Sequence, residues 1–382
     1  MKALCLSSIR RQNLLKLLEL LSFSPARTRQ GLAEASGLSQ MTVTNLVDLL
    51  KEQKALRLTA IERPGQKRPH SGRRAEAISL CGDAKAWLIV DISNLQFRLT
   101  LLGFDLQPLL EMRDEGQGEY MERLTAFLCS AKGQVAGALG GRTLPGVAIV
   151  TPGPYEIEKD TVTNQRIPQL NRVKIKALFR QYFGDQEYYV DEDVKFAVRA
   201  CYAPYAQEQC ELLYYLYIGE GVGGAAIHSG NILRGLNAAA GDAGHMRSAS
   251  GQPYESGLNL NAFTALLREG VPPGAANAPL PAAAEAAPDA YRAALDQMAR
   301  RTAEMLHGAL WMLDPTHVII DCSYAAPFED FFLARLRGHL LSLFSGEGRA
   351  LPLMRCADRQ VSSVLRGAIS VLQREWVERI IP

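Results

Sequence analysis

The feature that most constrains the fold lies in residues 28–74, where small and apolar residues occur at the spacing of a helix–turn–helix ahead of a basic stretch. Ala33 is small enough for two helices to cross closely, and Gly37 can adopt the positive φ of a sharp turn between them. Val43 and Leu46 would anchor the second of these helices against the first. The spacing therefore predicts a DNA-binding head.

Two further patterns complete the predicted head. Apolar residues recur every three or four positions over Ile9–Leu21, which predicts a preceding helix with one buried face. Ser39 is placed to cap the next helix at its N-terminus. The exposed side of that helix would offer short polar side chains to base edges in the major groove: Gln40, Thr42, Thr44 and Asn45.

The basic stretch follows directly. Six basic residues and one acid occur between Arg57 and Arg74, so the segment carries a net charge of +5 that phosphates would attract. The turn signal Pro64-Gly65 separates two expected strands, Leu56–Ile61 and Ala75–Leu80, which predicts a wing. The expected DNA contacts of the wing are Arg63, Lys67, Arg68, Arg73 and Arg74. We assign residues 1–80 to a winged helix–turn–helix; a solvated helix pair with a basic loop is the alternative.

Length and composition set outer limits. The chain has 382 residues, enough for two to three domains, and a formal charge of only +2, so the basic wing is a local feature. The seven cysteines include no CxxC pair, which suits reduced thiols. We find neither a signal peptide nor an apolar run of about eighteen residues, and expect a cytoplasmic protein that does not enter a membrane.

Beyond a boundary near residues 80–85, strands alternate with helices, which predicts an α/β body. Two buried strands, 87–92 and 97–104, would be joined by a tight turn at Ser93-Asn94. Later expected strands are Gly146–Val150, Tyr188–Val190, Leu213–Ile218, Ala225–Ile227 and Val318–Ile320, and expected helices are Met121–Gly137, Val173–Tyr182, Val194–Tyr205, Leu260–Glu269 and Tyr291–Leu313. The Ala- and Pro-rich segment 270–290 is expected to be flexible.

Several motifs in this body occur in a recognisable order. They are Pro152-Gly153-Pro154, Pro168-Gln169-Leu170, Asp191-Glu192-Asp193, Gly219-Glu-Gly-Val-Gly-Gly224, Gly241-Asp-Ala-Gly-His245, Leu313-Asp-Pro-Thr-His-Val-Ile-Ile320 and Leu365-Arg-Gly-Ala-Ile369. Together they resemble the ROK family, which groups sugar-responsive repressors with sugar kinases. The resemblance implies a two-lobed, actin-like/hexokinase-like body, with residues 85–195 in the first lobe and 196–382 in the second. Whether the C-terminal end returns to the first lobe stays open.

The resemblance also locates the parts of a kinase site. Asp193 matches the base that would take a proton from a sugar hydroxyl. Three nucleotide contacts depart from the kinase pattern: Asp91, Ser93 and Leu95 stand for Asp-x-Gly-x-Thr, Glu220 enters the second glycine loop, and residues 321–324 replace glycines near the adenosine. Lost donors and an added carboxylate disfavour phosphate binding. We therefore expect no nucleotide cofactor and a vestigial Asp193, and read the remaining glycines as turns between strands.

The structural zinc site of the family also departs from its pattern. The usual site has one histidine, matching His245, followed closely by three cysteines. Residues 246–257 contain no cysteine. We expect no metal here; the imidazole could instead bond a ligand hydroxyl or serve as a structural histidine.

The sugar pocket of the family is partly retained. Its matching residues are Gly153, Gln169, Glu192, Asp193, Asp242, His245 and Glu255. Glu192 replaces an amide, and the added charge favours a ligand rich in donors or a cationic one. Lys195 could cancel that charge by pairing with Glu192, and the sequence leaves this open.

Three functions compete at this point. The first is a transcriptional regulator, with repression favoured, that binds an operator as a dimer or tetramer and responds to a carbohydrate-like effector. The second is a sugar kinase of the ROK family carrying an added head. The third is a regulator whose degenerate pocket responds to a protein partner.

Overall fold

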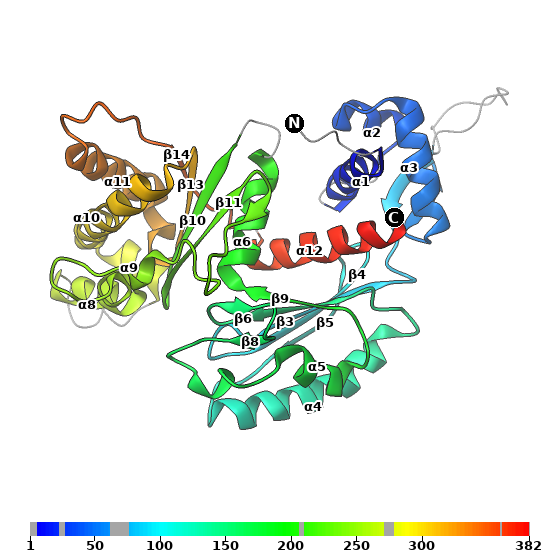
Figure 1. Cartoon of the computed structure of the whole chain (residues 1–382), viewed down its shortest axis with the longest axis horizontal. Coiled ribbons are helices and arrows are strands. Elements are labelled where there is room, and N and C mark those ends of the chain that lie inside the picture. Colours follow the sequence, from blue (N-terminus) through cyan, green and yellow to red (C-terminus); the bar gives the residue numbers. More distant parts are fainter. Residues whose placement is uncertain are drawn as a thin grey trace. The chain divides into compact units, whose positions relative to one another are not determined.

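The computed structural model describes residues 6–22, 27–61, 76–205, 210–270, 279–359 and 361–381. The chain divides into two compact units. Unit 1 comprises Met1–Asp191 and Ala368–Pro382, and unit 2 comprises Glu192–Gly367. The C-terminal segment of the chain thus belongs to the same unit as its N-terminal half (Figure 1).

Unit 1 begins with three helices and two strands. These elements are α1 (Leu6–Ser22), α2 (Arg29–Ser36), α3 (Gln40–Glu52), β1 (Leu56–Ala60) and β2 (Glu76–Leu80). The two strands pair antiparallel, and backbone hydrogen bonds of 3.0 and 2.7 Å join Arg27, two residues before α2, to Ile78 of β2. Three helices followed by such a strand pair form the winged helix–turn–helix expected from the sequence.

The turn between α2 and α3 has the chemistry its sequence requires. Gly37 has a φ of 67°, a left-handed conformation that favours glycine, and its N–H donates to the Ala33 carbonyl. Ser39 caps α3, because its hydroxyl accepts the Thr42 N–H at 3.1 Å. Val43 and Leu46 are buried against the other helices. The predicted turn and cap are confirmed.

The predicted wing contacts lie beyond what the structure describes. Residues 62–75 fall outside the described ranges, and with them Arg63, Lys67, Arg68, Arg73 and Arg74. Arg57, on β1, forms an exposed ion pair of 2.8 Å with Asp83.

The sheet of unit 1 has the order β5-β4-β3-β6-β9. Its strands are β3 (Ala86–Asp91), β4 (Arg98–Gly103), β5 (Pro108–Arg113), β6 (Val147–Thr151) and β9 (Tyr188–Glu192). β3 pairs antiparallel with β4 and parallel with β6. Two helices, α4 (Tyr120–Leu139) and α5 (Ile175–Phe183), bury their apolar faces with this sheet, as Figure 1 shows below it. The short strands β7 (Tyr155–Glu156) and β8 (Thr161–Val162) pair with each other.

The C-terminal helix α12 (Ser363–Ile380) supplies a second packing surface in unit 1. Its Trp376 is 4% exposed and packs edge-on against Phe104, with ring centroids 4.9 Å apart. The same helix contacts α1, because Gln373 donates to the Ser22 hydroxyl at 3.1 Å. α12 therefore connects the helical head with the sheet (Figure 1).

The sheet of unit 2 has the order β12-β11-β10-β13-β14. Its strands are β10 (Leu212–Ile218), β11 (Val222–His228), β12 (Asn231–Ile232), β13 (His317–Cys322) and β14 (Leu353–Cys356). Successive residues of β10 face opposite cores, since Tyr214 and Leu216 pack in one cluster and Leu213 and Tyr215 in another. Helix α6 (Asp193–Tyr202) covers the second cluster, and the helices on the other face are α7 (Tyr254–Leu258), α8 (Leu260–Gly270), α9 (Leu280–Ala286), α10 (Pro288–Leu313) and α11 (Glu329–Leu343).

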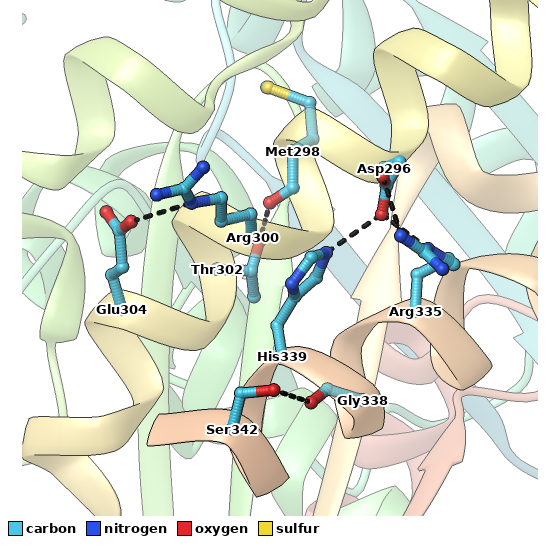
Figure 2. A network of polar contacts seen from close by, with 9 residues as sticks. All are labelled: Asp296, Met298, Arg300, Thr302, Glu304, Arg335, Gly338, His339 and Ser342. Carbon is cyan, nitrogen blue, oxygen red and sulfur yellow. Dashed lines mark hydrogen bonds and ion pairs between the residues drawn. The ribbon is translucent and has the colours of Figure 1, made fainter.

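A polar network joins α10 to α11 (Figure 2). Asp296 of α10 accepts two hydrogen bonds from the Arg335 guanidinium, at 2.6 and 2.9 Å, and one from His339 at 2.8 Å. The hydrogen bond from Arg335 is the main reason that the pKa of Asp296 lies below its ordinary value. These residues are partly exposed and form hydrogen bonds with one another. The network therefore has a structural role, which is to hold the two helices together.

Two expectations about local structure were wrong. Residues 92–97 form a six-residue connection between β3 and β4 in place of a tight turn, because Ile92 and Phe97 both turn into the core. The Ala- and Pro-rich segment is not flexible throughout: α9 is helical, with Ala283 and Ala284 buried. Alanine's high helix propensity accounts for the difference.

Strands β5 and β14 and helices α11 and α12 were not expected from the sequence. Among the described residues, no helix is long and apolar enough to cross a membrane.

Candidate functional site

The exposed face of α3 carries two of the four polar residues expected to read DNA. Gln40 and Asn45 are exposed, whereas Thr42 and Thr44 are half-buried. The Thr42 hydroxyl lies 2.9 Å from the Ser39 hydroxyl at the helix cap, so part of its hydrogen-bonding capacity is used there. Met41, which is not among the predicted contact residues, is 71% exposed in the first turn of α3.

An arginine of α2 forms ion pairs with both α3 and β2. Arg29 at the start of α2 lies 3.5 Å from Asp48 of α3 and donates to Glu76 of β2 at 3.0 Å. Both pairs are partly exposed, so each contributes on the order of 1 kcal/mol or less. Together they connect α2 to both α3 and β2.

The first loop matched to a kinase phosphate contact follows β3, and its polar groups form hydrogen bonds with one another. The Asp91 carboxylate accepts the Ser93 N–H at 2.9 Å and the Ser93 hydroxyl at 2.6 Å. Burial is the main cause that raises the pKa of Asp91. Leu95, at the expected threonine position, is 56% exposed and offers no hydroxyl. The loop thus uses its polar groups locally.

The glycines of the second loop are explained by packing inside unit 2. A Cβ on Gly219 would lie 2.2 Å from the Tyr217 hydroxyl, and one on Gly224 would lie 2.5 Å from the Gly241 carbonyl. Gly244 is equally confined, since its Cβ would meet the Val222 carbonyl at 2.1 Å. Close approach of neighbouring backbone therefore requires glycine at positions 224 and 244, in addition to the turn geometry expected from the sequence.

The third loop, after β13, contains a large aromatic residue. Tyr324 is fully buried and stacks on Phe263 with ring centroids 4.4 Å apart. Its hydroxyl donates to the Leu258 carbonyl at 2.9 Å. Asp321, at the end of β13, accepts from the Tyr215 hydroxyl at 3.0 Å. Side chains therefore occupy the place where the kinase pattern has glycines.

A buried ion pair lies next to the predicted base position. Glu192 and Lys195 are 5% and 1% exposed and pair with each other, and Lys195 also donates to the Ala238 carbonyl. The possibility left open by the sequence is thereby decided: Lys195 neutralises Glu192. Asp193, the first residue of α6, accepts the Val194 N–H at 2.7 Å.

Three further predicted pocket residues of unit 2 lie close to one another. The His245 Nε2 atom lies 3.4 Å from an Asp242 carboxylate oxygen. Burial raises the pKa of Asp242, and the nearby Glu255 carboxylate raises it further, while His245 and Lys195 oppose the rise. The other oxygen of Asp242 is buried without a hydrogen-bond partner. This oxygen is therefore an unused hydrogen-bond acceptor.

The two predicted pocket residues of unit 1 lie in the loop region after β6. Gly153 has a φ of 80°, and Asn164 fastens the loop beside it by donating to the Pro152 carbonyl at 3.0 Å. Gln169 lies in a single 3-10 turn (Pro168–Leu170) and is exposed. Both residues are accessible parts of an ordered loop.

In the segment matched to the family's zinc site, polar groups form hydrogen bonds with one another. Ser248 bonds both the Ser250 hydroxyl, at 2.8 Å, and the Gln252 carbonyl, at 3.0 Å. Arg247 donates to the Gly251 carbonyl at 2.6 Å. Within the described ranges, no three His, Cys, Asp or Glu side chains gather in a way that could hold a metal ion.

Comparison with solved structures shows the same fold in regulators and kinases. A ROK family transcriptional regulator, described as a homologue of the E. coli MLC protein, superposes with a TM-score of 0.64 at 16% identity over 98% of this chain and 99% of its own. A ROK family glucokinase from Streptomyces griseus, solved with glucose and AMPPNP, gives 0.63 at 19% identity over 75% and 98%. A ROK hexokinase from Thermus thermophilus gives 0.56 at 20% identity over 74% and 96%.

The difference in coverage is informative. The regulator matches the chain over its head and body, whereas each kinase, matched almost completely, accounts for about three quarters of this chain. No curated protein matches at a significant level. The ROK family profile matches residues 88–374, which is the body that follows the head. The chain therefore belongs to the ROK family and joins a winged helix–turn–helix to the family's actin-like/hexokinase-like body.

Proposed function

We propose that this protein is a DNA-binding transcriptional regulator, with repression as its mode of action. The observation that carries the proposal is the complete three-helix head with its capped, outward-facing helix α3 ahead of the ROK body. The likeness in fold to a transcriptional regulator over 98% of the chain supports it. In this assignment residues 1–80 bind operator DNA in the cytoplasm. The two lobes of the body respond to a signal, and their bounds are 85–191 with the returning segment 368–382 for the first lobe and 192–367 for the second.

The body serves as a sensor and not as an enzyme. Phosphoryl transfer needs donors around the phosphates and room for a nucleotide. Here Ser93 and Asp91 bond each other, and the buried Tyr324 fills the loop after β13. Asp193 then has no reaction to serve, and no cofactor is required.

The effector is a carbohydrate-like molecule. Asp242, with its unpartnered oxygen, and the neighbouring His245 and Glu255 supply acceptors suited to hydroxyl groups. Gly153, Gln169, Glu192 and Asp193 complete the proposed effector-binding set. Effector binding need favour one arrangement of the chain by only a few kcal/mol to alter operator affinity. Paired heads in a dimer or tetramer would match a two-fold operator.

Charge reversal in the wing tests DNA binding. We expect Arg73→Glu with Arg74→Glu to weaken binding of double-stranded DNA at least tenfold at low salt and to flatten its salt dependence. Fluorescence anisotropy with the full chain measures both. Reversal of the exposed Arg300, which lies in unit 2, is the matched control. Unchanged affinity across salt concentrations would refute the wing assignment.

The kinase alternative is tested with Mg-ATP and a panel of sugars. Turnover abolished by Asp193→Asn would establish a kinase and overturn the sensor assignment. Calorimetry with neutral sugars, amino sugars and sugar phosphates separates the remaining alternatives. Saturable binding of any of them favours the effector model, and absence of binding favours a regulator that responds to a protein partner.

A further inference from the structure

The recognition helix exposes an apolar side chain at the centre of its outer face. Residues of an α-helix advance by about 100° each. The buried stripe of α3 consists of Val43, Leu46, Val47 and Leu50. Met41 lies opposite the middle of that stripe and is 71% exposed. Its thioether side chain therefore projects directly away from the body of the head.

The neighbours of Met41 narrow what this face can contact. Asn45 follows one turn later, and Asp48 follows in the next turn. The Asp48 carboxylate is paired with Arg29, at 3.5 Å. Recognition helices place their base-reading residues in their N-terminal turns, and Met41 and Asn45 lie in the first two turns of α3.

The chemistry of the major groove offers an apolar partner. Thymine presents its C5-methyl group there, whereas the other base edges present hydrogen-bond donors and acceptors. We propose that Met41 packs against a thymine methyl group and selects an A·T pair at that position of each half-site. The inference rests on the proposed function, because it presumes that α3 enters the major groove. Polar neighbours such as Asn45 then read adjacent bases.

The test removes either the methyl group or the side chain. Duplexes are selected by the full-length protein from a random double-stranded library, and each thymine of the resulting half-site is replaced in turn by uracil, which lacks only the methyl group. We expect one replacement to weaken wild-type binding about three- to fivefold, the effect of burying one methyl group. Met41→Ala should lose about as much on the thymine duplex and lose nothing further on the uracil duplex.

Two variants complete the experiment. Met41→Leu keeps an apolar side chain and should retain most of the sensitivity to uracil. Met312→Ala removes an 84% exposed methionine from α10 and should change neither affinity nor uracil sensitivity. Equal uracil penalties in wild type and Met41→Ala at every position would overturn the inference and leave DNA binding intact, as would a selected half-site without thymine. Failure to select any duplex would overturn the proposed function as well.

Discussion

At the scale of single residues, the structure gives partners to charges whose role the sequence leaves undetermined. Glu192 alone suggested a pocket with an extra negative charge and a cationic ligand. Its pairing with Lys195, both nearly fully buried, removes that charge. Among the predicted pocket residues, Asp242 has a buried carboxylate oxygen without a hydrogen-bond partner, beside His245.

Removing one member of the buried pair should be costly. We expect Lys195→Met to lower the free energy of unfolding by about 3–5 kcal/mol, because it leaves the Glu192 carboxylate buried without a partner. The double variant Glu192→Gln with Lys195→Met should lose less. Urea unfolding measures both. The exposed pair of Arg300 and Glu304 is the control, and Arg300→Ala should cost less than about 0.5 kcal/mol. A Lys195→Met effect as small as that of Arg300→Ala would contradict the role assigned to the pair.

At the scale of elements, helix contacts depend on polar groups as well as on apolar faces. The pairing of α10 with α11 includes the Asp296, Arg335 and His339 network of Figure 2. The sequence predicted α10 but neither α11 nor this contact. Its polar residues are separated by about forty positions, and only the fold brings them together.

This network should make stability depend on pH in a defined direction. The pKa of Asp296 is lower in the folded protein than its ordinary value near 4, so the network's contribution is present above that ordinary value and is lost as pH falls through the lower folded pKa. Asp296→Asn should therefore cost up to about 1 kcal/mol at neutral pH, with solvent screening the exposed pair, and progressively less below about pH 4. Urea unfolding of both proteins across pH measures the difference. A constant difference from pH 7 to pH 3 would disprove this account.

At the scale of the whole molecule, the chain leaves unit 1 after Asp191 and returns to it at Ala368. Ala368–Pro382 belong to that unit, and Trp376 is the large side chain that packs there against Phe104. A local pattern cannot show this return, because the partners lie about 270 positions apart in the sequence. The sequence alone therefore leaves this return open.

Truncating this tryptophan should loosen one unit selectively. We expect Trp376→Ala to destabilise unit 1 by about 3–5 kcal/mol, the usual cost of removing a buried aromatic side chain. Hydrogen exchange should accelerate in β3 and β4 of unit 1 more than in β10 and β13 of unit 2. Trp311→Ala removes a half-exposed tryptophan from α10 and serves as the control, with a smaller effect confined to unit 2. Equal acceleration of exchange in both units after Trp376→Ala would be inconsistent with this assignment.

Local sequence patterns determined the head and most of the body's central elements. The turn at Gly37, the cap at Ser39 and the apolar stripe of α3 follow from rules that act within a few residues, and the structure shows each of them. The family is likewise apparent from short motifs in a fixed order. The match of the ROK family profile to residues 88–374 confirms it.

Contacts between distant residues were decided only by the tertiary structure. The fold pairs Glu192 with Lys195 and buries Tyr324 in a core. It also brings neighbouring backbone so close to Gly224 and Gly244 that only glycine fits there. The structure also shows Met41 exposed on the outer face of α3. The physical reason is that a side chain's energy depends on the solvent and charges around it, and these surroundings are created by folding.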